Sequence, residues 1–196
     1  MIARYSDIPL NEAEVLRYAG CREAEAAALD LLYTCYDELR GGLTYTVCYD
    51  ELPVAVRGTM CDFERFSLQS ADLAAYFDGC DRTLLFAATV GVAPDRLITK
   101  YNRLSPAKAL MMQALGAQSI EALCDRFCED AARQYGALCV SRFSPGYGDL
   151  PLEAQRDIFR VLDCTHNIGL CLNDSLLMSP TKSVTAFVGI KEKTTV

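Results

Sequence analysis

The spacing of apolar residues along the chain predicts several helices. Between about residues 22 and 40 these residues recur at helical intervals, and the pair Gly41-Gly42 ends the pattern. A longer periodic run starts at Ser105-Pro106, where the proline suits a first helical position, and continues to about Tyr135. Shorter helices are expected over residues 11–19, 70–79, 94–103 and 152–164.

Other segments show the patterns of strands. Residues 43–49 alternate apolar with polar side chains, which is typical of a half-buried strand. Residues 84–91 are continuously apolar, and this predicts a strand that is buried on both faces. Residues 53–57 and 60–67 are expected to complete a small antiparallel meander. Further strands are expected near residues 137–142, 171–178 and 183–190.

These elements predict an α+β protein with an antiparallel or mixed sheet and long helices. The character of the chain changes near residue 80, where short elements give way to the apolar strand and the longest helix. We therefore predict two lobes. Residues 1–79 would form a helical and meander lobe, and residues 80–196 an α+β core.

Composition and charge narrow the function classes. The chain has 196 residues, of which 51% are hydrophobic and 23% charged, as in an ordinary globular protein. No apolar run reaches the length of a membrane span, and the first residues do not form a signal peptide. We therefore expect a cytoplasmic protein without a membrane partner. The net charge of −7 argues against nucleic acid as a partner, because phosphate backbones are bound by clustered Lys and Arg.

Ten cysteines raise the question of a metal or disulfide site. Cys124 and Cys128 are four residues apart, so they share one helix face with Glu121. Two thiols can hold a metal only with further ligands, and the chain has no Cys-x-x-Cys pair and a single histidine, His166. Without a secretory signal the thiols are expected to be reduced and buried, and we predict no metal and no catalytic acid–base residue.

The segment Arg142-Phe143-Ser144-Pro145-Gly146-Tyr147-Gly148 carries the clearest binding chemistry. Pro145 and Gly146 favour a tight turn that a ligand can approach closely. Arg142 has a charged fork suited to a carboxylate, and Tyr147 has a flat face for an aromatic ring or a cation. By itself the segment is also compatible with an ordinary surface turn.

This segment and three others resemble the activation (reactivation) domain of cobalamin-dependent methionine synthase. Its Arg-x-x-x-Gly-Tyr motif falls on Arg142, Ser144, Gly146 and Tyr147, with serine in place of the usual alanine. The family's first core strand and its long helix are similar to residues 85–91 and 121–129. Its closing signature, Gly-x-x-Leu-x-x-Ser-x-x-Met-x-Pro-x-x-Ser-Val, is similar to residues 169–184.

The resemblance implies a site for S-adenosylmethionine. Arg142 would hold the ligand's carboxylate, and main-chain groups of Ser144 and Gly146 would hold its polar edge. Tyr147 would pack on the ligand, and Glu121 would balance its ammonium or sulfonium charge.

The resemblance also implies a reactivation module rather than a complete enzyme. The chain lacks the Asp-x-His-x-x-Gly cobalamin motif, so cobalamin is expected only through a partner, a cobalamin-binding methyltransferase module. The protein would act in trans and support the reductive methylation of cob(II)alamin, with a flavodoxin-like protein as electron donor.

Two alternatives remain open from the sequence. One is a docking or regulatory module that kept the fold and lost the ligand, because residues 1–79 show no counterpart of the family's ligand-binding aspartate and the family's later tyrosine pair is missing. The other is a thiol-based reductant, which the scatter of the cysteines disfavours. Convergence of Arg142, Tyr147 and Glu121 on one cleft would favour ligand binding, whereas a structural salt bridge at Arg142 would favour docking.

Overall fold

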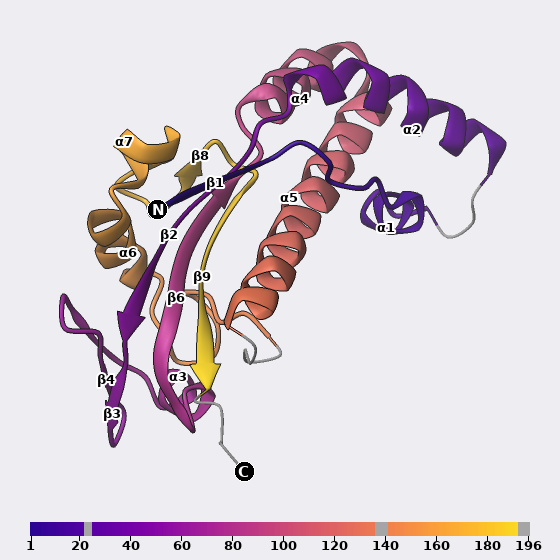
Figure 1. The fold of residues 1–196 in the computed structure, drawn as a ribbon. Helices are drawn as coiled ribbons and strands as arrows, with labels where there is room; N and C mark the ends of the chain where they lie inside the picture. Colours follow the sequence, from indigo (N-terminus) through magenta and orange to yellow (C-terminus); the bar gives the residue numbers. More distant parts are fainter. Residues whose placement is uncertain (22–24, 136–140, 192–196) are drawn as a thin grey trace.

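A four-stranded antiparallel sheet forms the centre of the protein (Figure 1). The computed structural model describes residues 1–21, 25–135 and 141–191. The strands lie in the order β1 (Ile2–Tyr5), β2 (Tyr45–Pro53), β6 (Cys80–Thr89) and β9 (Ser183–Lys191), so β1 and β9 are the edges. The predicted α+β class with an antiparallel sheet is confirmed, although the short edge strand β1 was not expected.

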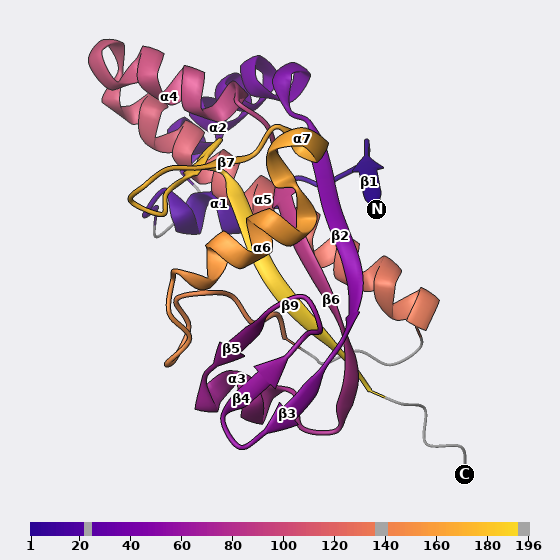
Figure 2. The same ribbon diagram turned by 90° about the vertical axis from the view of Figure 1, so that its left-hand side faces the viewer.

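Helices cover both faces of this sheet (Figures 1 and 2). The long helix α5 (Pro106–Tyr135) lies on one face, and α6 (Ala154–Leu162) and α7 (Cys164–Ile168) lie on the other. In β6, Leu84 packs toward α5 and Leu85 packs toward the opposite cluster, and both are fully buried. The prediction of a strand buried on both faces is therefore confirmed.

A second helical layer packs on the first half of α5. It comprises α1 (Glu12–Tyr18), α2 (Ala26–Leu39) and α4 (Ala93–Leu104). A 3-10 turn at Arg40–Gly42 directly follows α2. The side chain of Asn11 accepts a hydrogen bond from the main-chain N–H of Glu14 (3.2 Å), which caps the start of α1. The helix predicted over residues 22–40 begins at Ala26, and residues 22–24 lie outside the described part of the chain.

Residues 54–79 form a meander and a short helix, but the strand expected over residues 60–67 is divided into two strands, and the strand expected over residues 43–49 runs on to Pro53 and belongs to the main sheet. Strands β3 (Ala55–Arg57), β4 (Met60–Asp62) and β5 (Ser67–Gln69) make a small antiparallel sheet, and α3 (Ala71–Tyr76) follows. Phe63 joins this part to the main sheet, because its ring stacks on Phe187 of β9 with a centroid separation of 5.2 Å.

The main sheet contains strands from both sides of residue 80, since β2 pairs with β6 from Thr46 to Pro53. The predicted lobes 1–79 and 80–196 therefore share one sheet. The strand expected over 171–178 is a hairpin of β7 (Cys171–Leu172) and β8 (Met178–Ser179). Most of the strand expected over 137–142 lies outside the described residues. No helix in the described ranges is both long and apolar enough to span a membrane.

Candidate functional site

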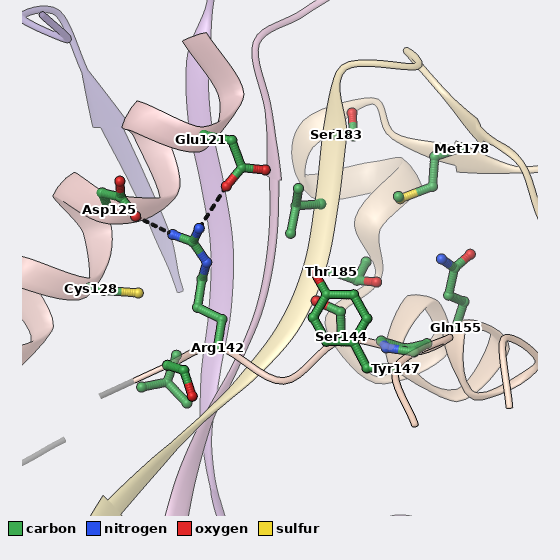
Figure 3. Close-up of a pocket in the computed structure, with 14 residues that line it drawn as sticks. Glu121, Asp125, Cys128, Arg142, Ser144, Tyr147, Gln155, Met178, Ser183 and Thr185 are labelled. Atoms are coloured by element: carbon green, nitrogen blue, oxygen red, sulfur yellow. Dashed lines mark hydrogen bonds and ion pairs between the residues drawn. The ribbon is translucent and has the colours of Figure 1, made fainter. Parts of the chain in front are cut away.

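A cavity of about 470 Å³ lies beside the edge strand β9, between α5 and α6 (Figure 3). Residues from both faces of the sheet reach it, because it wraps around the sheet edge. Its lining residues come from α5, the segment after residue 140, α6, β8 and β9. They are Glu121, Asp125, Cys128, Ser141, Arg142, Ser144, Pro145, Tyr147, Gln155, Met178, Ser183, Val184, Thr185 and Val188.

Arg142 forms the charged end of this cavity together with two carboxylates of α5 (Figure 3). Its Nη2 donates to Oε2 of Glu121 and its Nη1 donates to Oδ1 of Asp125, each at 2.7 Å. Glu121 and Asp125 are one helical turn apart, so both side chains face the same direction. The guanidinium side chain is 22% exposed, against 45% for Glu121 and 68% for Asp125.

The main chain on both sides of Arg142 is held against the sheet edge. Phe143 and Phe187 exchange two main-chain hydrogen bonds, of 3.0 and 2.8 Å. The hydroxyl of Tyr76 donates to the carbonyl of Ser141 at 2.8 Å. This pairing fixes the backbone direction, and the Arg142 side chain consequently extends toward α5.

The electrostatics of this end favour a cation. One guanidinium faces two carboxylates, so the group carries a net negative charge. Burial lowers the pKa of Arg142, but the acidic groups around it, Asp125 and Glu121 among them, outweigh burial and the net direction is upward. The guanidinium therefore stays charged.

The neighbouring thiols are neutral. Burial raises the pKa of Cys128, which lines the cavity, and that of Cys124, which is buried in the core beneath it. A thiol with a raised pKa is a poor nucleophile and a poor metal ligand. In the described ranges no cluster of three or more His, Cys, Asp or Glu side chains could hold a metal ion.

The Gly-Tyr turn forms one wall of the cavity. Gly146 adopts a φ of 91°, which favours glycine, and its N–H donates to the carbonyl of Leu150 at 2.9 Å. The N–H of Tyr147 donates to the carbonyl of Ser144 at 3.1 Å. Tyr147 is 58% exposed, so much of its ring is accessible to a ligand.

The turn is anchored to α3 by a pair of aspartates. The carboxylate of Asp149 accepts hydrogen bonds from the hydroxyl of Ser70 and from the N–H groups of Ala71 (2.7 Å) and Asp72 (3.2 Å). In return, the N–H of Asp149 donates to Asp72 (3.0 Å). Gly148 is required here, because a Cβ atom would lie 2.0 Å from the Asp72 carboxylate.

The opposite end of the cavity is polar but uncharged (Figure 3). Gln155 of α6 and Thr185 of β9 are 6% and 2% exposed. Within the described ranges, Oε1 of Gln155 and Oγ1 of Thr185 have no hydrogen-bond partner. Met178 and Ser183 complete this end.

Four of the five predicted site residues line this one cavity, namely Glu121, Arg142, Ser144 and Tyr147. Gly146 shapes the turn without lining the cavity, and its N–H is bonded within the turn. Arg142, Tyr147 and Glu121 converge on one cavity, which is the arrangement expected for ligand binding. Arg142 is also in salt bridges, which is the arrangement expected for a docking module.

The sequence prediction did not include Asp125, Gln155 and Thr185. The helical spacing from Glu121 indicates Asp125, because residues four apart share a face. Gln155 and Thr185 have no such local signal.

Comparison with known proteins shows the family and the fold of this chain. The family model described as vitamin B12 dependent methionine synthase, activation domain, matches residues 66–195. The fold is similar to the crystal structure of the MetH reactivation domain bound to AdoHcy, with a TM-score of 0.69 and 16% sequence identity over 96% of this chain and 72% of that chain. No curated protein matches the sequence. The resemblance inferred from the motifs is confirmed.

Proposed function

Because this chain belongs to the family of vitamin B12 dependent methionine synthase activation domains, we propose that it is a reactivation module that binds S-adenosylmethionine. The observation that supports this most directly is the cavity in which Arg142, Glu121 and Tyr147 converge. The module would act in trans on a cobalamin-dependent methionine synthase or a related corrinoid methyltransferase.

The size and charge of the cavity fit this ligand. Small-molecule sites commonly have volumes of roughly 300–1,000 Å³, and this cavity has about 470 Å³. S-adenosylmethionine has a sulfonium, an ammonium and a carboxylate, and therefore carries a net positive charge. The group of Arg142, Glu121 and Asp125 carries a net negative charge, so ligand and site are complementary.

Each charged side chain then has a role in binding. Arg142 uses one N–H for each of its two salt bridges, and its guanidinium has further donors with which to reach the ligand's carboxylate. Glu121 and Asp125 face the ammonium or sulfonium from α5. Tyr147 offers its exposed ring for packing against the ligand.

The contribution of this chain to the reaction is positioning. The partner's cobalamin, when bound, supplies the cobalt centre that accepts the methyl group. This chain holds the ligand in one orientation, which turns an encounter in solution into a reaction between aligned groups. It needs no nucleophile of its own, and the neutral thiols of Cys124 and Cys128 agree with that.

The partners are proposed from the family. Its description as a domain of vitamin B12 dependent methionine synthase supports a cobalamin-binding methyltransferase module as the partner. We also propose a flavodoxin-like protein as the electron donor, because the reductive methylation of cobalt requires an electron.

One observation favours a second candidate function. Arg142 is paired with two carboxylates, and a guanidinium with two such partners can have a purely structural role, in which it holds the segment after residue 140 against α5. The protein would then be a docking or regulatory module that kept the fold without binding S-adenosylmethionine.

Calorimetric titration with S-adenosylmethionine separates the two candidates. We expect the wild-type protein to bind and Arg142→Ala to bind about tenfold more weakly, because the ligand's carboxylate loses a charged donor that is partly screened by solvent. Arg133→Ala is the control, since Arg133 also pairs with two carboxylates of α5, Glu129 and Asp130, but lies outside the cavity. A wild-type protein without affinity, alone and with a cobalamin-loaded methyltransferase module, would contradict the binding function and favour docking.

A further inference from the structure

The uncharged end of the cavity contains two buried polar atoms that the proposed charge recognition does not use. Oε1 of Gln155 and Oγ1 of Thr185 lack a hydrogen-bond partner within the described residues, and both side chains are more than nine-tenths buried. They come from different elements, α6 and β9, and both line the same cavity. Only the tertiary fold therefore brings these two side chains to the same cavity.

Such atoms are costly for the free protein. A buried oxygen without a hydrogen bond loses its contact with water and receives nothing in exchange. Leucine and valine have nearly the same shapes as glutamine and threonine and would avoid this cost. Two unpartnered oxygens on side chains that line one cavity consequently indicate a ligand that supplies the missing partners.

The edge strand adds main-chain groups on the same side. The N–H and carbonyl of Phe187 both point out of the sheet edge, where they bond to Phe143. Main-chain directions repeat every second residue of a strand, so the N–H and carbonyl of Thr185 point toward the same open edge. This end of the cavity thus presents donors and acceptors from both side chains and the backbone.

Two flat or polarisable groups flank these atoms (Figure 3). Tyr147 presents its ring from the Gly-Tyr turn, and Met178 presents its thioether from β8. Aromatic rings and thioethers both pack well against a flat heteroaromatic ring. The combination of flat apolar flanks and in-plane polar atoms suits a nitrogen-containing base.

We infer that this end is a specificity site for an amino-substituted purine. The Gln155 amide accepts a hydrogen bond from the exocyclic amine and donates to a ring nitrogen, which is the pairing that glutamine makes with adenine. The Thr185 hydroxyl donates to a second ring nitrogen. The inference rests on the proposed function, in which the purine is the adenine of S-adenosylmethionine, and it adds the residues that select this base.

The test compares adenosine with inosine, in which a carbonyl replaces the amine, using the full chain. Wild-type protein should prefer adenosine. Gln155→Leu should weaken the binding of adenosine and of S-adenosylmethionine by about tenfold or more and bring the adenosine-to-inosine ratio close to one. Thr185→Val should weaken both adenine ligands with a smaller effect on the ratio.

Thermal unfolding without ligand provides a second readout. Gln155→Leu and Thr185→Val should unfold at the same or a higher temperature than wild type, because each removes an unpartnered buried oxygen. The matched control is Gln118→Leu, since Gln118 is 5% exposed but donates to the carbonyl of Pro9 at 3.1 Å. That variant should unfold at a lower temperature.

The possible outcomes separate this inference from the proposed function. If S-adenosylmethionine binds in an Arg142-dependent way and both variants bind like wild type, the inference is wrong and the proposed function stands. If adenosine binds through Gln155 and S-adenosylmethionine does not bind, the inference stands and the proposed function fails. If neither ligand binds, both fail. If both variants are destabilised without ligand, the oxygens have a structural role and the inference is wrong.

Discussion

The polar groups at the two ends of the cavity differ in whether they have partners within the protein. At the charged end Arg142 is already paired with Glu121 and Asp125 in the free protein. At the uncharged end Gln155 and Thr185 have buried oxygens without partners among the described residues. The charged end is therefore preorganised, and a ligand must share existing ion pairs there. At the uncharged end, a ligand of the inferred kind would supply the hydrogen bonds that these oxygens lack.

This difference indicates how affinity and specificity are divided. Charged groups that are one-quarter to two-thirds exposed contribute modestly, since solvent screens them. Buried neutral groups discriminate strongly, because a wrong ligand leaves them unsatisfied. We expect the charged end to select for net charge and the uncharged end to select the base.

The largest effect on the difference between the two ends is expected when the carboxylates of the charged end are neutralised. In the double variant Glu121→Gln with Asp125→Asn, we expect S-adenosylmethionine to bind roughly tenfold or more weakly, since two carboxylates no longer face its positive charges. AdoHcy lacks the sulfonium and should be affected much less. Calorimetry with both ligands measures the change in selectivity.

Two further variants act as references for that experiment. Glu129→Gln also removes a carboxylate of α5, outside the cavity, and should change neither affinity. Between the single variants, Glu121→Gln should have the larger effect, because Glu121 is the less exposed of the pair. Equal losses for both ligands would show that the carboxylates do not sense the sulfonium.

Much of the fold follows from local sequence patterns. The long helix starts at Pro106 as the Ser-Pro pair predicts, and Ser70 caps α3 by accepting from the N–H of Leu73 at 2.9 Å. The edge strand β1 escaped prediction because four residues give too little periodicity. Its partner β2 lies forty residues away, and only the tertiary fold brings the two together.

The site was predictable only where one segment carries its chemistry. The Arg142 to Tyr147 motif is contiguous, and Asp125 lies one turn from Glu121. Gln155 is one of several polar residues in the amphipathic helix α6, and Thr185 is an ordinary strand residue. Nothing local distinguishes either residue from a surface position, because their burial results from the packing of α6 on one face of the sheet.

Hydrogen bonds of Tyr76 connect the two ends of the cavity, and a substitution of Tyr76 should weaken this connection. Its hydroxyl donates to the carbonyls of Ser141 (2.8 Å) and Phe187 (3.3 Å) and accepts from the N–H of Gly189 (3.0 Å). Tyr76→Phe should lower the free energy of unfolding by about 1–2 kcal/mol, since main-chain groups lose a partner. Urea denaturation followed by circular dichroism measures this.

The same variant should also weaken ligand binding, because Ser141 precedes Arg142 in the chain. Tyr33→Phe provides the control, since Tyr33 is 45% exposed and its hydroxyl bonds to Glu12 on the surface. That control should stay within a few tenths of a kcal/mol of wild type. Normal binding by a destabilised Tyr76→Phe protein would show that the two ends are positioned independently.

The smallest expected effect concerns the anchor of the Gly-Tyr turn and depends on pH. Hydrogen bonds from the Ser70 hydroxyl and from main-chain N–H groups hold the pKa of Asp149 below its usual range. A lowered pKa in the folded state stabilises the protein above the unfolded-state value, about 3.9. The stabilisation is lost as the pH falls through the folded-state pKa.

Asp149→Asn should therefore lower the midpoint of thermal unfolding by a few degrees at pH 7, and the difference from wild type should shrink below about pH 4. Melting curves of Asp37→Asn, which alters an exposed carboxylate of α2, should show a smaller difference across the same range. A difference at Asp149 that persists undiminished to the lowest pH would assign the anchor to the shape of the side chain rather than to its charge.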